Sequence, residues 1–359
     1  MKVLHVITNL ETGGAEKLLV DFLPLLKQDC QVELALFQGQ KTEFYKRLKD
    51  KGITIHSFSE NRNVYHLKNV FCLAKLARKF DIVHTHNTAC QIYGAIASLF
   101  SKAKWCTTEH TTTSRHRVWW FAPVEKWMYS RYTHVICISE ATQQSMQEVV
   151  GKSAPETTVI CNGINIKKYH DAFPASDLKK DGKIITMVGR WSYQKDQATI
   201  IRAIAKLPKV YKLWLVGYGE TEEVLKALAR KLCVNDRVLF LGLRNDVPNI
   251  LKASDVVVQS SHIEGFGLAA VEGMAAGKPI IASDVEGLAQ VVKDAGLLFP
   301  HEDADTLALE IEGVCMNEVL YSELVEKGYV RAAQYDISTM VEGYTTVSYT
   351  HLRAHETKA

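Results

Sequence analysis

The chain has 359 residues and a mass of 40.3 kDa, which is enough for about two domains that each build their own core. Hydrophobic residues make up 47% and charged residues 23% of the sequence, and this balance excludes a disordered or fibrous protein. The formal net charge of +3 is a smaller basic excess than nucleic-acid-binding proteins usually carry, so we expect no nucleic acid partner.

We expect a cytoplasmic protein, because no apolar run approaches the ~20 residues of a membrane span and residues 1–9 do not resemble a secretory signal. Eight scattered cysteines without a C-x-x-C pair fit that compartment. They are predicted to be reduced thiols that pack as small hydrophobic residues, not zinc ligands or nucleophiles.

Short apolar runs alternate with helical stretches along the whole chain. Seven predicted strands lie in the first half: 3–8, 32–37, 53–58, 82–85, 103–108, 134–138 and 158–161. Six more lie in the second half: 184–188, 213–216, 238–241, 256–259, 280–282 and 296–299. Val/Ile/Leu runs separated by helices are typical of parallel strands that are buried on both faces. The predicted fold class is therefore α/β, with two doubly wound, Rossmann-like domains facing across a cleft.

The domain boundaries follow from changes in this pattern. We predict a first domain at 1–165, a polar linker at 166–182 and a second domain at 183–335. A helical pattern at 336–346 could cross back to the first domain. Residues 347–359 have neither an amphipathic period nor turn chemistry, so they are interpreted as a disordered end or a non-native addition.

Polar residues follow several of the predicted strands, where open parallel sheets bind their ligands. Gly13 and Gly14 follow the first strand and would let the backbone approach a ligand, with helix N–H groups behind them. The alternative is a tight turn that needs positive φ. His84 and His86 share one face of a strand, and His110 follows the next strand. Hydrogen bonding is the favoured interpretation of these histidines, because no third metal ligand has suitable spacing.

The second half offers charged groups at the same kind of junction. Arg190 and Lys195 follow a glycine turn after the strand at 184–188, where they suit a diphosphate; a solvated basic turn is the alternative. The segment 216–220 contains G-x-G but lacks the third glycine of the dinucleotide fingerprint, which argues against NAD. Asp303-Ala304-Asp305 matches a metal-binding D-x-D string, but it precedes a helical stretch and is predicted to cap it. We therefore expect no metal and no cofactor.

The most informative segment is 260–273, SSHIEGFGLAAVEG, which follows a strand and opens a helix. Its glycines expose backbone N–H groups at the helix start, which favours an anion there. Glu264 and Glu272 lie beside that position. An anionic ligand next to two carboxylates must also present hydroxyl groups that donate hydrogen bonds to these carboxylates. A nucleotide sugar has both the anionic phosphates and such hydroxyl groups.

The spacing Glu264-x7-Glu272 resembles the E-x7-E signature of retaining glycosyltransferases of family 4, which have the GT-B fold. The resemblance covers about 1–335. It includes these further segments: Gly13-Gly14-Ala15-Glu16, His110, Ile138-Ser139-Glu140, Asn162-Gly163-Ile164-Asn165, Gly189-Arg190 with Lys195, and Leu241-Gly242.

The resemblance implies a role for each matching residue. Arg190 and Lys195 would hold the diphosphate of a nucleoside-diphosphate sugar and stabilise the leaving group, with Gly13 and Gly14 facing that diphosphate. Glu272 would bind the ribose and Glu264 the sugar hydroxyls. Backbone N–H groups of Phe266, Gly267 and Leu268 would contact sugar and phosphate, and His110 would lie near the transferred sugar. The anomeric configuration would be retained through front-face departure, without a side-chain base.

The acceptor is expected to be a glycan or a lipid-linked glycan, in surface polysaccharide or lipid-linked oligosaccharide synthesis. Residues 115–132 interleave basic and aromatic side chains, which suits peripheral contact with an anionic membrane on its cytoplasmic face. The alternative is a helix that buries Trp127 with its bases in water. A nucleotide-sugar epimerase and a non-catalytic nucleotide-sugar-binding protein remain alternative functions.

Overall fold

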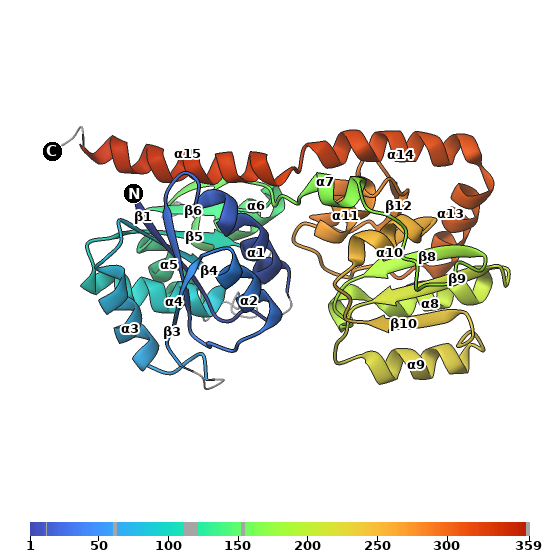
Figure 1. Ribbon diagram of the computed structural model, residues 1–359, viewed down its shortest axis with the longest axis horizontal. Helices are drawn as coiled ribbons and strands as arrows, with labels where there is room; N and C mark the ends of the chain where they lie inside the picture. The colour runs from blue at the N-terminus through green and yellow to red at the C-terminus, as the bar shows by residue number, and fades with distance from the viewer. Residues whose placement is uncertain (12, 60–62, 111–120, 152–154, 357–359) are drawn as a thin grey trace. The chain divides into compact units, whose positions relative to one another are not determined.

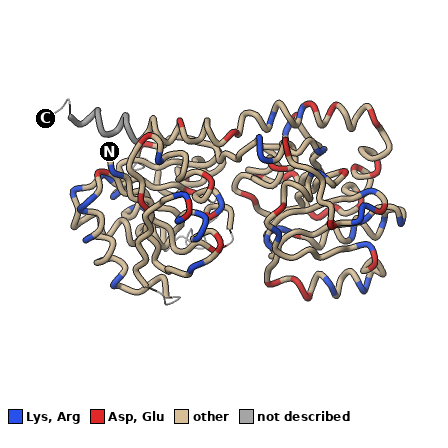
Figure 2. Tube along the Cα trace, in the orientation of Figure 1, with Lys and Arg blue, Asp and Glu red and all other residues tan. Residues whose placement is uncertain are grey.

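The computed structural model describes the chain except residues 12, 60–62, 111–120, 152–154 and 357–359, and it describes side chains of the last helix as far as Val347. The chain divides into two compact units (Figure 1). Unit 1 comprises Met1–Gly163 together with Ile337–Ala359, and unit 2 comprises Ile164–Asp336. Lys and Arg are interspersed with Asp and Glu along the described parts of both units (Figure 2).

Unit 1 contains a seven-stranded parallel sheet in the order β3-β2-β1-β4-β5-β6-β7. The strands are β1 (Lys2–Ile7), β2 (Gln31–Leu36), β3 (Thr54–Ser57), β4 (Ile82–His86), β5 (Lys104–Glu109), β6 (His134–Cys137) and β7 (Glu156–Val159). The order reverses between β1 and β4, as in a doubly wound fold.

Unit 2 contains a six-stranded parallel sheet in the order β10-β9-β8-β11-β12-β13. The strands are β8 (Lys183–Val188), β9 (Tyr211–Val216), β10 (Val238–Gly242), β11 (Val256–Gln259), β12 (Ile280–Ser283) and β13 (Leu297–Phe299). The reversal lies between β8 and β11. The predicted α/β class with two Rossmann-like domains is confirmed.

Helices connect successive strands in both units. In unit 1 they are α1 (Gly14–Leu26), α2 (Glu43–Asp50), α3 (Lys68–Ala77), α4 (Thr88–Ala97), η1 (Ser98–Phe100), α5 (Ala122–Ser130), α6 (Glu140–Val150) and α15 (Ile337–Glu356). In unit 2 they are α7 (Ile166–His170), η3 (Tyr193–Lys195), α8 (Gln197–Lys206), α9 (Glu222–Lys231), α10 (Val247–Ala253), α11 (Leu268–Ala275), α12 (Leu288–Val292), α13 (Ala304–Met316) and α14 (Glu318–Ala333).

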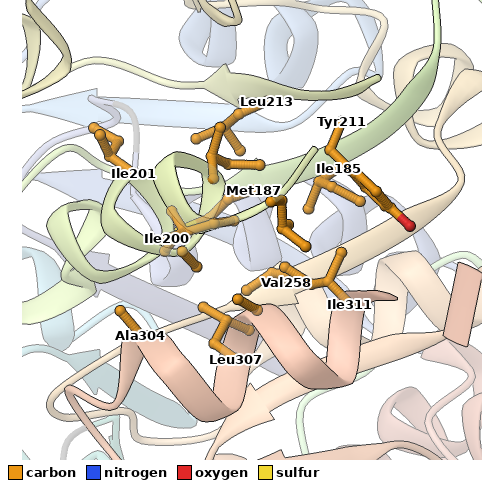
Figure 3. Close-up of a cluster of buried hydrophobic side chains, with 14 of the residues drawn as sticks. Ile185, Met187, Ile200, Ile201, Tyr211, Leu213, Val258, Ala304, Leu307 and Ile311 are labelled. Carbon is orange, nitrogen blue, oxygen red and sulfur yellow. The ribbon is translucent and has the colours of Figure 1, made fainter. Parts of the chain in front are cut away.

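The largest core of unit 2 shows why its strands read as continuous apolar runs. Ile185 and Met187 of β8 and Val258 of β11 point into one cluster, where α8 and α13 cover them (Figure 3). A second cluster lies around Ile184 of β8 and Trp214 of β9. Adjacent residues of β8 thus enter different cores, because successive side chains point to opposite faces of a sheet.

The first unit likewise has two extensive buried clusters, besides a small one around Val3, Ile82 and Cys106. One gathers Val83 of β4 with side chains of α3, α4 and α5. The other gathers Leu34 of β2 with α1 and with α15. The long C-terminal helix therefore completes the core of the unit that also contains the N-terminus.

Helix α15 corrects the expectation for the C-terminal segment. Met340, Tyr344 and Val347 are all buried against unit 1, so the apolar period runs one turn beyond Tyr344. The backbone stays helical to Glu356, which contradicts the disordered end that was one of the two interpretations of 347–359; the other, a non-native addition, stays a prediction. Extending a helix that is already packed costs little free energy per added residue, because the unfavourable nucleation step has been completed. Leu352, Ala354 and Glu356 are also good helix formers.

The segment 166–182 also differs from the linker expected there. It belongs to unit 2 and opens with α7, because the Asn165 side chain accepts a hydrogen bond from the Lys168 N–H at 3.0 Å. Ile164 N donates to Tyr335 O at 2.9 Å, and Ile164 pairs with Asp336. The two places where the chain passes between units are thus hydrogen-bonded together.

Candidate active site

The candidate donor site lies at the strand-order reversal of unit 2. Ligands of open α/β sheets bind beyond the carboxyl ends of the strands at such a point. The segment after β8 carries Arg190 and Lys195, and the segment after β11 carries Glu264 and the start of α11. The sheet topology therefore brings the two charged junctions predicted from the sequence to one edge.

Lys195 and Glu264 form an ion pair at this edge, in which Lys195 Nζ donates to Glu264 Oε2. The two side chains are 25% and 16% exposed, so the pair is only partly screened by water. The surrounding backbone is tied as well, because His262 N donates to Gln194 O at 2.9 Å. An anionic ligand would compete with Glu264 for the ammonium group.

Arg190 lies at the same edge with its side chain exposed. Its carbonyl oxygen accepts a hydrogen bond from Gln197 Nε2 at 2.9 Å, which fixes the backbone of this turn to the start of α8. The guanidinium is thus carried on a fixed backbone, at a position suited to a phosphate.

The start of α11 is built by Gly267, which has φ of 99°. A Cβ at this position would also lie 2.7 Å from Leu288 Cδ1. Both the positive φ and this close contact therefore favour glycine here. Phe266 is buried and packs edge to face on Tyr335, with ring centroids 5.2 Å apart. Only the backbone of Phe266 is therefore suited to a ligand, together with the first N–H groups of the helix at Leu268.

Glu272 lies within α11 and is 3% exposed. The E-x7-E spacing thus places one carboxylate in the loop beside Lys195 and the other inside the unit. Two carboxylates in such different surroundings suit two different hydroxyl-bearing parts of one ligand.

A histidine cluster beside the Lys195 pair was not anticipated from the sequence. His262 Nδ1 lies 2.9 Å from His301 Nε2 and 3.7 Å from Glu302 Oε1, and its ring packs on Tyr193. These residue types could hold a divalent cation such as zinc. The sequence gives one signal for this cluster, which is that His262 lies inside the segment 260–273. His301 follows a different strand, so no sequence spacing links it to His262.

Asp196, the residue after Lys195, caps α8 by accepting a hydrogen bond from Thr199 N at 3.2 Å. Burial raises the pKa of this carboxyl group, and the hydrogen bonds from Thr199 and the nearby His262 partly oppose that rise.

The D-x-D string has the predicted capping role, since Asp303 Oδ1 accepts hydrogen bonds from Asp305 N and Thr306 N, both at 3.0 Å.

Gly13 and Gly14 lie at the reversal point of unit 1, after β1. Gly13 caps α1 with φ of −155°, and Gly14 is its first residue, so neither needs the positive φ considered for this turn. A Cβ on Gly13 would lie 2.1 Å from Glu16 Oε2, whereas a Cβ on Gly14 would meet nothing within 4 Å. Only the flexible end of the Glu16 side chain would have to move for a Cβ on Gly13, so packing strictly requires neither glycine.

His110 follows β5 at the same edge of unit 1 and is partly exposed. Its Nε2 lies 3.1 Å from His86 Nδ1, and burial lowers the pKa of His110 to about 4. His84 forms a hydrogen bond as well, at 2.7 Å between Nε2 and Thr108 Oγ1. The histidines of these strands are thus hydrogen-bonded, as favoured from the sequence.

Residues 115–120 of the basic and aromatic stretch lie outside the described residues. In α5, Met128 and Tyr129 are buried, while Trp127 is 42% exposed. The alternative in which Trp127 enters the core is therefore wrong. None of the helices in the described part of the chain combines the length and apolar character needed to cross a bilayer.

Comparisons with known proteins agree with this arrangement. Residues 12–168 match the family model described as Glycosyltransferase Family 4, and residues 169–331 match that of Glycosyl transferases group 1. UDP-Gal:alpha-D-GlcNAc-diphosphoundecaprenol alpha-1,3-galactosyltransferase of Escherichia coli is 31% identical over 282 residues, which are 71% of this chain and 72% of the relative. Phosphatidyl-myo-inositol mannosyltransferase of Mycolicibacterium smegmatis is 28% identical over 285 residues, which are 75% of this chain and 72% of the relative.

The fold is also similar to solved structures. Anabaena HepE, crystallised in complex with UDP and glucose, aligns with a TM-score of 0.87 at 24% identity, and the alignment covers 98% of this chain and 100% of HepE. The two family models together span residues 12–331, which include the residues assembled at the edge of each sheet. The chain therefore belongs to glycosyltransferase family 4 and has the GT-B fold.

Proposed function

We propose that the chain is a retaining, metal-independent hexosyltransferase, which moves a sugar from a nucleoside-diphosphate sugar to a glycan or lipid-linked glycan acceptor. The observation that carries this proposal is the ion pair of Lys195 and Glu264 beside the glycine-capped start of α11. It places a cation for phosphate and a carboxylate for hydroxyl groups side by side.

In the proposed donor complex, Lys195 and Arg190 bind the diphosphate. Negative charge grows on the leaving phosphate as the bond from the anomeric carbon to the phosphate oxygen breaks, so both cations bind more tightly in the transition state. Glu264, released from Lys195, accepts hydrogen bonds from the sugar hydroxyls, and Glu272 binds the ribose. At the edge of unit 1, a Cβ on Gly14 would meet nothing within 4 Å, so the backbone there is open to a ligand.

Retention requires the acceptor oxygen to bond the anomeric carbon on the face that the leaving group vacates. The acceptor proton then passes to the departing phosphate oxygen, and the products are the glycosylated acceptor and a nucleoside diphosphate. This route needs no side-chain base and no bound metal or cofactor. His110, with its pKa lowered to about 4 by burial, is neutral near pH 7 and suits hydrogen bonding to the transferred sugar.

A lipid-linked acceptor at the cytoplasmic membrane face is supported by the surface of α5. Val124 and Trp127 are exposed there, and Lys126 and Arg131 are exposed beside them. Apolar and basic groups on one surface suit an anionic bilayer. The two relatives named for diphosphoundecaprenol-linked and phosphatidyl-inositol substrates support the same acceptor class.

Incubation with UDP-, GDP- and ADP-sugars, with and without a diphosphoundecaprenol-linked glycan, tests the proposal. We expect acceptor-dependent release of one nucleoside diphosphate and an NMR coupling at the new anomeric centre that matches the donor. Inversion of that centre would contradict retention. A donor sugar converted to its epimer without acceptor would instead identify an epimerase.

A further inference from the structure

A chain of three histidines runs from the edge of unit 1 into its interior. His110 Nε2 lies 3.1 Å from His86 Nδ1, and His86 Nε2 lies 3.0 Å from His5 Nδ1. His86 and His5 are each 1% exposed, whereas His110 is partly exposed. Both ring nitrogens of His86 are thus used, one toward the surface and one toward the core.

The rings of this chain are held by stacking. His84 lies parallel to His86, with centroids 4.7 Å apart and an interplanar angle of 5°, and it also stacks on Tyr344 of α15 at 5.5 Å. Thr108 Oγ1 joins His84 Nε2 to the Tyr344 hydroxyl at 2.7 and 3.0 Å. The C-terminal helix therefore supports the ring plane of His86, which contacts His110.

A metal ion shared by His5, His84 and His86 does not fit these contacts. Their ligand atoms are close together, but both nitrogens of His86 already take part in hydrogen bonds. The rings also lie within 19° of parallel, so the in-plane lone pairs do not converge on one point as metal ligation requires.

The inner end of the chain sets the direction of its hydrogen bonds. Within the described residues, His5 Nε2 is buried and has no hydrogen-bond partner. If every histidine donated inward from Nε2, this atom would carry a buried N–H without an acceptor, and such orphaned donors are rare. If every histidine donates outward from Nδ1, the orphan is only a lone pair, which is the smaller penalty.

We propose that His86 and His5 are positioning residues that fix His110 in its Nδ1–H tautomer. Outward donation places a proton on Nδ1 of His5, Nδ1 of His86 and, because Nε2 of His110 is occupied as an acceptor, Nδ1 of His110. His110 then offers a ligand an N–H donor and not a basic nitrogen. This rests on the proposed function in one respect, since the ligand would be a hydroxyl of the transferred sugar.

The direct test is the tautomer of His110, measured by ¹⁵N-histidine long-range correlation spectra of the intact protein near pH 7. We expect the Nδ1–H form for His110, His86 and His5. An Nε2–H form of His110 would overturn the proposal. Metal analysis that found zinc bound in the wild type and lost in His5→Asn would overturn it as well.

Three variants separate positioning from mere packing. In His86→Leu, His110 should revert to Nε2–H, and kcat/KM should fall about tenfold, the upper value for one hydrogen bond. In His86→Asn, whose side-chain amide can donate from the place of Nδ1, His110 should keep Nδ1–H and recover activity. His134→Leu removes an equally buried histidine of β6 that is outside the chain, so the His110 tautomer should not change.

An unchanged His110 tautomer in His86→Leu would contradict the proposal. If a variant does not fold, the wild-type spectrum still decides the tautomer. The spectra require no donor or acceptor, so the tautomer can be established even if transfer fails, and transfer can be established even if the tautomer is wrong.

Discussion

Lys195 and Glu264 are 69 residues apart in the sequence and form an ion pair at the carboxyl edge of the six-stranded sheet. Neither residue lies in a regular strand or α-helix: Lys195 ends the short helix η3, and Glu264 lies in the loop before α11. Their contact follows from the pairing of β8 with β11, which puts the two loops next to each other. This pair is the centre of the proposed donor site.

Truncation of the Lys195 side chain tests its proposed role in the departure of the leaving phosphate. Removing one half of a buried charge pair costs about 2–5 kcal/mol, so Lys195→Ala should lower kcat/KM about 30- to 4,000-fold. Steady-state assays would measure this ratio. Lys206→Ala is the matched control, because it breaks an exposed pair with Asp305 and should leave turnover unchanged. A loss within threefold for Lys195→Ala would refute the phosphate role.

Substitution of Glu264 should have opposite effects on nucleoside diphosphate binding and on turnover. In Glu264→Gln the ammonium of Lys195 no longer has a charged competitor, so a free nucleoside diphosphate should bind more tightly than in the wild type. Turnover should fall, because the sugar hydroxyls lose a charged acceptor. Calorimetry would measure the affinity of the wild type and of Glu264→Gln for the nucleoside diphosphate. Weaker nucleotide binding in this variant would argue against competition for Lys195.

Two glycine substitutions separate backbone strain from ligand contact. Gly267→Ala should lower the free energy of unfolding by about 1–3 kcal/mol, because φ is 99° and the new Cβ meets Leu288. Gly14→Ala should leave the melting temperature unchanged, since its Cβ meets nothing within 4 Å, but should weaken donor binding. Equal melting temperatures for Gly267→Ala and the wild type would contradict the strain at α11.

The buried histidines make stability depend on pH. Burial lowers the pKa of His5 to about 3 and that of His110 to about 4, and it lowers the pKa values of His84 and His86 well below 6.5. The unfolded chain therefore takes up protons first as pH falls. The free energy of unfolding should be constant above about pH 6.5 and should decrease below it, by up to about 1.4 kcal/mol per pH unit for each histidine.

Urea unfolding between pH 7.5 and 5 would measure this slope. His84→Gln should reduce the slope, because it removes one of the buried histidines. A free energy of unfolding that is equal at pH 5 and at pH 7.5 would show that these histidines are not held neutral in the folded chain.

Chelation tests the proposed metal independence. Transfer should persist in EDTA, because Lys195 and Arg190 supply the positive charge that a metal would otherwise bring to the diphosphate. Activity that disappears with EDTA and returns with Mn²⁺ would contradict the proposed role of the two cations. Double substitution of His262 and His301 would then show whether their cluster holds that ion.

Much of the fold could be predicted because each strand is a compact apolar run. The predicted strand at 256–259 matches β11 without change, and the ends of the other twelve predicted strands differ from the observed ends by at most two residues. The C-terminal helix could not be predicted to its full length. Its last turns lack an apolar period, and their helical structure depends on the preceding turns that Met340 and Tyr344 hold against unit 1.

The site was predictable in its residue types and not in its contacts. Glycines and charged residues after strands could be placed at a sheet edge from the alternation of strands and helices alone. The pairing of Lys195 with Glu264, and the stacking of His84 on Tyr344 across 260 residues of chain, depend on side-chain packing between distant segments. No local pattern encodes such contacts.

The measurement that tests the central claim most directly is a thermal-shift panel of UDP, GDP, ADP and NAD on the wild-type chain and on Lys195→Ala. We predict that one nucleoside diphosphate raises the melting temperature of the wild type by several degrees and that Lys195→Ala loses most of this shift. A shift with NAD alone, or an equal nucleoside-diphosphate shift in both proteins, would contradict a donor site built on Lys195 and Glu264.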